Sequence, residues 1–178
     1  MARECLKRLG VDAVWFLVSP GNPQKPQGGM AAFDARAKSL GALVAGRPSM
    51  VVSDIEARLG TRYSADTVGA LKKAMPRTRF IWIMGADCLA GFHTWYRWRE
   101  IAKMLPIAVF DRPAYANHGL NSKFARCFAK FRTTPQRLSR SAPPAWAFVQ
   151  MPRHPGSATK LRQQMGRNWP AGVNSKET

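Results

Sequence analysis

Acidic residues are scarce in this chain of 178 residues, which carries 10 Asp and Glu against 28 Lys and Arg, a formal net charge of +18. No acidic residue stands between Asp111 and Glu177. A field of this sign attracts polyanions, either nucleotide phosphates or nucleic acid. A solvated basic surface explains the same charge equally well, so the charge alone names no ligand.

Long apolar runs and paired cysteines are missing as well. No apolar stretch approaches the ~20 residues that a membrane span needs. No signal peptide is visible, because Met1–Gly10 has the pattern of a charged amphipathic helix. Cys5, Cys88 and Cys127 are odd in number and widely spaced, which argues against a disulfide scaffold and gives no metal-ligand spacing. We therefore expect a cytoplasmic protein with no membrane partner and no protein-bound metal site.

Strand patterns alternate with helical patterns along most of the chain, and 46% of its residues are hydrophobic. This alternation predicts an α/β fold, a doubly wound parallel sheet with helices on both faces. We expect one domain over residues 1–165 and a polar tail over 166–178, with the basic segment 113–144 as a surface excursion. The strand candidates are 13–18, 50–55, 80–84, 107–110 and 146–151, and the helix candidates are 30–44, 66–75, 98–105 and 158–165.

One strand candidate is followed directly by residues that can bind a ligand. The apolar run from Phe80 breaks at Gly85, and Asp87 and Trp95 follow. In open α/β sheets, ligands bind in the crevice at the carboxyl ends of the strands. Gly85 would let a ligand approach the backbone, Asp87 could hold a hydroxyl or an amide, and Trp95 offers a flat face to an aromatic ring. This combination predicts a nucleotide site.

Ordered motifs make the chain similar to the bacterial nicotinate-nucleotide adenylyltransferases, members of the Rossmann-like nucleotidyltransferase superfamily. The similarity runs from about Ala2 to Arg162, and the order and spacing of the motifs carry it. The matching stretches are 14–23 with Lys25, 52–56, 62–67, 84–87, 94–95, 112–113 and 157–162.

The resemblance implies a Rossmann-like fold and a reaction of NAD biosynthesis. The phosphate of nicotinate mononucleotide would attack the α-phosphate of ATP, giving deamido-NAD and pyrophosphate, with Mg²⁺ accompanying ATP. No covalent enzyme intermediate is implied, so catalysis would rest on positioning and electrostatic stabilisation.

The resemblance also implies roles for particular residues. Trp95 would stack on the nicotinate ring, while Tyr63 and Thr67 would contact the ring and its carboxylate. Plainer interpretations stay open, a structural aromatic for Trp95 and a helix cap for Thr67. The full nicotinate-nucleotide set is Tyr63, Thr67, Gly85, Asp87, Trp95 and Arg112, and the ATP and phosphate set is Lys25, Ser157, Thr159 and Arg162.

One motif of the superfamily is missing, a His-x-Gly-His pair that follows the first strand. The histidines of this chain, His93, His118 and His154, all stand elsewhere. Its beginning matches the interior of the helix that follows that strand. We therefore expect the first, central strand of the sheet to be missing, which leaves two flanking strands without their shared partner.

This departure bears on activity. Removing a single donor of transition-state charge stabilisation typically lowers a rate ~10²-fold or more. We assign no catalytic residue, and we expect this polypeptide alone to have little or no adenylyltransferase activity, as a fragment or as a chain whose true start lies upstream.

Two alternatives belong to other function classes. A basic nucleic-acid-binding domain would use the acid-free half of the chain to track phosphates. No helix-turn-helix, zinc-ligand or RNP-type motif supports it, so nucleic acid is not expected as a partner. An adenylyltransferase for another phosphate-bearing acceptor, such as phosphopantetheine, is the second alternative, and the Trp95 and 63–67 matches favour nicotinate mononucleotide instead.

Overall fold

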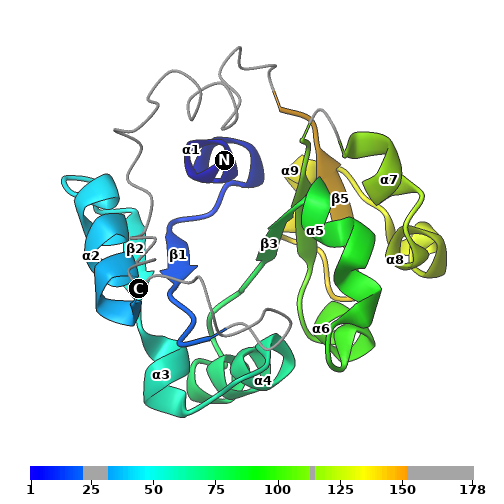
Figure 1. Cartoon of the computed structure of the whole chain (residues 1–178). Helices are drawn as coiled ribbons and strands as arrows, with labels where there is room; N and C mark the ends of the chain where they lie inside the picture. Colours follow the sequence, from blue (N-terminus) through cyan, green and yellow to red (C-terminus); the bar gives the residue numbers. More distant parts are fainter. Residues whose placement is uncertain (22–31, 113–114, 152–178) are drawn as a thin grey trace, which may run out of the picture.

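The computed structural model describes residues 1–21, 32–112 and 115–151 (Figure 1). All five predicted strands are confirmed, each within a few residues of its expected bounds. Every strand pairing is parallel, which confirms the α/β class. The strands are β1 (Val14–Leu17), β2 (Met50–Ser53), β3 (Trp82–Gly85), β4 (Ile107–Phe110) and β5 (Trp146–Val149).

Helices separate the strands, as the apolar periodicity predicts. The predicted helix at 158–165 lies outside the described residues. The helices are α1 (Ala2–Leu9), α2 (Phe33–Val44), α3 (Ile55–Leu59), α4 (Ser64–Ala74), α5 (Ala86–Gly91), α6 (Trp98–Met104), α7 (Ala116–Leu120), α8 (Lys123–Cys127) and α9 (Pro135–Leu138), with 3-10 turns η1 (Phe92–Thr94) and η2 (Ala129–Phe131).

The start of α4 differs from the prediction. The sequence predicts a helix from residue 66 with Thr67 as a candidate cap, whereas the helix begins at Ser64 after an extended Tyr63. The backbone N–H groups of Asp66 and Thr67 both donate to the Tyr63 carbonyl, at 3.0 and 3.1 Å. Thr67 therefore lies in the first turn of the helix rather than before it.

The strands β3, β4 and β5 form a sheet that is covered on both faces. Ile107 and Val109 of β4 pack into one apolar cluster, which α5, α6 and α8 complete. Ala108 and Phe110 pack into a second cluster, which α1 and α9 complete. All four β4 side chains are fully buried, as expected for a parallel strand enclosed by helices.

Helix α8 corrects the expectation that residues 113–144 form a surface excursion. Phe124 and Phe128 are buried in the same cluster as Phe92, with the Phe124 ring 5.0 Å from Phe128 and 5.4 Å from Phe92. The expectation is wrong for α8 because Phe124 and the C-cap residue Phe128 are four positions apart, which puts both rings on the side that packs into the cluster.

The strands β1 and β2 form a separate two-stranded sheet, and α2 packs on β2. Figure 1 shows this pair and β5 on opposite sides of α1. Within the described ranges, β1 pairs with β2 alone and β3 with β4 alone. This split agrees with the expectation that two strands lack a shared central partner. Among the described residues, no helix has both the length and the apolar character needed to cross a membrane.

Candidate functional site

The carboxyl ends of β3 and β4 bring three of the predicted residues together. Gly85 ends β3, Asp87 stands in the first turn of α5, and Arg112 follows β4. Because Gly85 pairs in register with Phe110, the two strands end side by side. Nη1 of Arg112 lies 3.3 Å from Oδ2 of Asp87, and both side chains are partly exposed. This pair sits where ligands of parallel sheets bind.

Glycine at position 85 allows the side chains of Asp87 and Arg112 to pack closely against the backbone. A Cβ added to Gly85 would lie 2.3 Å from Oδ1 of Asp87 and 3.0 Å from Nε of Arg112. Any larger side chain would displace the carboxylate, the guanidinium or both. The close approach of a ligand to Gly85 stays a prediction, and the structure shows that the Asp87 and Arg112 side chains lie close to this residue.

Two carboxylate oxygens at this edge have no hydrogen-bond partner within the described part of the chain. They are Oδ1 of Asp87 and Oδ1 of Asp111, and both are buried. A buried acceptor without a donor destabilises the fold unless a ligand or ion satisfies it. The site therefore offers acceptor oxygens to a hydroxyl, an amide or a cation.

These oxygens also bear on the divalent cation that nucleotidyl transfer implies. Among the residues that the structure describes, no group of three His, Cys, Asp or Glu side chains could hold a metal ion. A cation that binds through substrate phosphates and one or two carboxylates needs no such group. Asp111, whose buried Oδ1 has no partner among the described residues, is a carboxylate of that kind.

Trp95 follows η1, and neighbouring rings hold its side chain. Its ring meets Phe92 at 5.3 Å and Trp82 at 6.3 Å, both edge to face. Trp95 is half-buried against the main apolar cluster, so both a structural and a stacking role are compatible with its position. The ring contacts fix the orientation of the indole before any ligand binds.

Tyr63 lies against the loop that carries Trp95. The rings of Tyr63 and Tyr96 are 4.6 Å apart, and Arg97 reaches across to Asp66 of α4 at 3.3 Å. Arg97 also forms a hydrogen bond with Glu100, which lowers the pKa of that carboxyl. These contacts place the start of α4 beside the Trp95 loop, as a site that uses both would require.

Thr67 is fully buried, and its hydroxyl is already engaged. It lies 2.8 Å from the Thr61 hydroxyl, and its single hydrogen has two acceptors within reach, the Tyr63 carbonyl at 3.2 Å and the carboxylate of Glu56 at 3.4 Å. Glu56 is itself buried. The contacts describe a residue that shapes the loop, and its predicted contact with the nicotinate carboxylate stays a prediction.

The phosphate set cannot be placed. Lys25, Ser157, Thr159 and Arg162 all lie outside the described residues. Sequence reasoning also missed the contributions of Glu56, Tyr96 and Arg97. The one sequence signal for Tyr96 and Arg97 is that they directly follow Trp95. Nothing in the sequence pattern indicates that these two residues contact α4.

A family model described as cytidylyltransferase-like matches residues 1–164. The chain belongs to the cytidylyltransferase-like family. This match covers the described strands and helices of both sheets, so the family assignment applies to the fold as a whole.

Relatives within the cytidylyltransferase-like family narrow the assignment. The chain is 44% identical over 169 residues to a protein of Roseobacter denitrificans, covering 93% of this chain and 84% of that protein. It is 43% identical over 179 residues to a protein of Ruegeria pomeroyi, covering 99% of this chain and 82% of that protein. Both are named "probable nicotinate-nucleotide adenylyltransferase". The predicted family resemblance is confirmed.

Solved structures agree at the level of the fold. The nicotinic acid mononucleotide adenylyltransferase of Plasmodium falciparum, complexed with NaAD, matches with a TM-score of 0.61 at 12% identity, over 86% of this chain and 69% of that one. The same enzyme complexed with APC matches with a TM-score of 0.58. The Rossmann-like nucleotidyltransferase fold is thereby confirmed.

Proposed function

We propose that this chain transfers the adenylyl group of ATP to nicotinate mononucleotide, giving deamido-NAD and pyrophosphate in NAD biosynthesis. The identity of about 44% to relatives named for this activity, over 93% of the chain, carries the proposal. The pairing of Asp87 with Arg112 at the ends of β3 and β4 supports it, since nucleotides bind at that edge of parallel sheets.

The acceptor nucleotide would bind between the strand ends and the Trp95 loop. Trp95 would stack on the nicotinate ring, with Tyr63 beside it, because neighbouring rings already orient both side chains. Arg112 is half-exposed and would pair with the phosphate or carboxylate of the nucleotide. Oδ1 of Asp87 would accept a hydrogen bond from a sugar hydroxyl.

Mg²⁺ is the cation that we propose, and when bound it neutralises charge on the triphosphate of ATP. Asp111 would hold it together with the phosphates. The protein contributes position and charge in this scheme, and the attacking phosphate needs no protein nucleophile. Lys25, Ser157, Thr159 and Arg162 remain the predicted contacts of the ATP phosphates.

The test offers ATP and Mg²⁺ to the full chain with three acceptors, nicotinate mononucleotide, nicotinamide mononucleotide and phosphopantetheine. Chromatography measures the adenylylated product, and calorimetry measures acceptor binding. We expect deamido-NAD and the tightest binding with nicotinate mononucleotide. Equal or better turnover with phosphopantetheine would favour the second alternative, and neither binding nor product with nicotinate mononucleotide would refute the proposal.

The same assay tests the expected low turnover. If the missing His-x-Gly-His pair limits the chemical step, nicotinate mononucleotide binds while product forms slowly. Rapid multiple turnover would contradict that expectation and leave the proposed reaction intact. The relatives do not favour a nucleic-acid-binding function.

Arg112→Ala tests the site itself, with Arg126→Ala as its matched control. Both arginines are exposed and follow Asp111 in the acid-free segment, but only Arg112 pairs with Asp87. We expect Arg112→Ala to weaken binding of nicotinate mononucleotide about tenfold or more, as for loss of a charge-assisted hydrogen bond. Arg126→Ala should change it less than twofold. Equal effects would mean that only the overall charge matters.

A further inference from the structure

The chain turns from Trp95 into α6 through a residue with an unusual backbone. Arg97 has a φ of 51° and a ψ of 36°, and it is the one described residue other than glycine with a positive φ. A residue with a Cβ is disfavoured in this left-handed region, and it persists there where surrounding contacts hold it, often beside a ligand. The Arg97 carbonyl accepts hydrogen bonds from the N–H groups of Glu100 and Ile101, at 2.9 and 3.3 Å. Arg97 therefore sets the direction in which the Trp95 loop joins α6.

Two carboxylates hold the guanidinium of Arg97. Nη1 lies 3.3 Å from Oδ1 of Asp66, in the first turn of α4, and Nη2 pairs with Oε2 of Glu100, in the first turn of α6. Asp66 and Arg97 are 31 positions apart, so their pair joins two helices, whereas the Glu100 pair stays at the start of α6. Glu100 therefore orients the guanidinium, and Asp66 connects it to α4.

Aromatic rings lie beside this connection on both segments. Tyr63 directly precedes α4, and its ring centroid is 4.6 Å from that of Tyr96. The Arg97 guanidinium lies over the Tyr96 ring, 5.8 Å from its centroid. Because Tyr96 is 50% exposed, the ring contact buries little apolar surface by itself. The ion pair between Asp66 and Arg97 is thus the polar contact that holds the Trp95 loop beside Tyr63.

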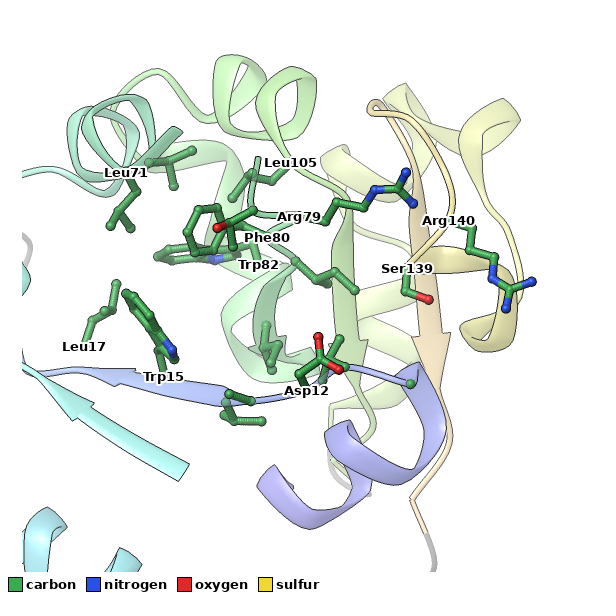
Figure 2. Close-up of a pocket in the computed structure, with 18 residues that line it drawn as sticks. Asp12, Trp15, Leu17, Leu71, Arg79, Phe80, Trp82, Leu105, Ser139 and Arg140 are labelled. Carbon is green, nitrogen blue, oxygen red and sulfur yellow. The ribbon is translucent and has the colours of Figure 1, made fainter. Parts of the chain in front are cut away.

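A second polar contact joins the same two helices at their other ends. Nζ of Lys72 in α4 donates to the Met104 carbonyl of α6 at 3.0 Å. Figure 2 shows this end, where Leu71 of α4 and Leu105 directly after α6 line one cavity. Helices α4 and α6 therefore have one polar connection beside the Trp95 loop and another remote from it. The remote connection supplies a control for the first.

We propose that Arg97 is a positioning residue, whose ion pair with Asp66 fixes the Trp95 loop against the start of α4. Trp95 and Tyr63 then already lie in the arrangement that receives the pyridine ring, so Arg97 acts through Trp95. The inference rests on the proposed function, because it assigns Arg97 to the acceptor side of that site. Exposed ion pairs contribute little to the free energy of unfolding. The contribution of this pair is to binding, since a loop held in place loses less conformational freedom when the nucleotide binds.

Asp66→Asn separates this role from a simple effect of charge. The substitution removes a negative charge, which by Coulomb attraction alone should strengthen binding of an anionic nucleotide. If the ion pair positions the Trp95 loop, the substitution should instead weaken binding of nicotinate mononucleotide about fivefold. Asp66→Glu keeps the carboxylate and should restore binding to within twofold of the wild type. Calorimetry on the full chain measures these affinities, and ATP binding should stay within twofold throughout.

Lys72→Met is the matched control. Lys72 lies about 9 Å farther along α4 than Asp66, and its substitution removes the other polar connection to α6. We expect Lys72→Met to leave binding of nicotinate mononucleotide within twofold of the wild type. Equal weakening by Lys72→Met and Asp66→Asn would mean that any loosening between the two helices acts alike, and it would overturn the proposal.

Arg97→Gly separates the side chain from the backbone. Glycine adopts a left-handed φ without a steric penalty, so the turn into α6 is kept and the urea midpoint should not fall. Removal of the guanidinium should still weaken binding of nicotinate mononucleotide about fivefold. A lower urea midpoint with unchanged binding would assign Arg97 to folding alone and overturn the proposal.

Hydrogen exchange of the nucleotide-free chain tests the connection without a ligand. The N–H of Trp95 donates to the Phe92 carbonyl at 3.0 Å, and that of Trp98 donates to the Trp95 carbonyl at 3.2 Å. Asp66→Asn should speed exchange at these two amides at least threefold, and Lys72→Met should leave it unchanged. Unchanged exchange in Asp66→Asn would overturn the proposal.

The binding results also distinguish this inference from the function on which it rests. Equal binding of nicotinate mononucleotide by the wild-type chain and all four variants would overturn the role of Arg97 alone. No binding by the wild-type chain would overturn the proposed function, and the role of Arg97 with it.

Discussion

Strands β1 and β4 have similar apolar sequences and opposite surroundings. Strand β4 reads Ile-Ala-Val-Phe and is fully buried, whereas β1 reads Val-Trp-Phe-Leu and leaves Trp15 39% exposed. Strand β4 pairs on both edges, with β3 and β5, whereas β1 pairs only with β2 among the strands that the structure describes. Helices cover both faces of β4. The comparison shows that the burial of an apolar strand depends on the elements that pack around it as much as on its own side chains.

The two sheets therefore differ in how deeply their side chains are buried. Most of the large buried aromatics, among them Phe92, Phe124 and Trp146, lie in one cluster around β3, β4 and β5. In β2 no side chain is fully buried, and Val51 is 38% exposed. Stability should accordingly concentrate in the β3–β4–β5 sheet, while the β1–β2 sheet opens at lower free energy.

The largest expected effect compares two phenylalanines. Phe92 is fully buried and its ring meets Trp95, Trp98 and Phe124, whereas Phe16 of β1 is half-buried. We expect Phe92→Ala to lower the free energy of unfolding by about 3–5 kcal/mol, as for other buried aromatic truncations. Phe16→Ala should lower it by about 1–2 kcal/mol, because less apolar surface is lost.

Urea unfolding followed by circular dichroism measures both values. Equal losses for the two variants would break the comparison, because they would mean that the β1–β2 sheet contributes as much as the larger one.

The second effect is a pH dependence that arises where α1 packs on the β3–β4–β5 sheet. Burial raises the pKa of the Cys5 thiol from its ordinary value of 9.0 to about 11. Because the fold favours the neutral thiol, this contribution is fully present below pH 9 and is lost as pH rises towards 11. The loss should reach about 2–3 kcal/mol of unfolding free energy.

Unfolding measured from pH 8 to 11 checks this effect, with Cys5→Ala as the variant that removes it. Cys127→Ala is the control, since Cys127 is exposed. A Cys5→Ala chain with the same steep fall as the wild type would contradict the prediction.

The smallest effect concerns β3, whose last residue, Gly85, borders the candidate nucleotide site. Gly85→Ala would push its Cβ into Asp87 and Arg112, so we expect about tenfold weaker binding of nicotinate mononucleotide. At Gly91 of α5, no atom lies within 4 Å of an added Cβ. Gly91→Ala should leave binding unchanged, and calorimetry distinguishes the two.

Local patterns in the sequence carried much of the fold. The strands and most of the longer helices follow from apolar periodicity, as in β4, where the predicted and observed bounds coincide. The start of α4 and the burial of α8 did not follow. The start of α4 is set by hydrogen bonds in the turn at Tyr63. The burial of α8 depends on the contact between Phe124 and Phe92, which are 32 positions apart in the sequence.

The candidate site was also predicted only in part. Its residue types and the family were predicted from short motifs, because Gly85, Asp87 and Trp95 stand close together in the sequence. The pairing of Asp87 with Arg112 joins two strands and was not foreseen. Nor was the contact of Tyr63 with Tyr96, which joins the start of α4 to the loop after η1.

The sequence by itself determined which segments form strands and helices, that the sheets are parallel, and to which enzymes this chain is related. Only the tertiary structure decided which of the described strands pair with one another, and that Gly85 packs against the side chains of Asp87 and Arg112. The reason is physical. Backbone propensity and apolar periodicity act over a few neighbouring residues, whereas strand pairing and close packing join residues that are far apart along the chain.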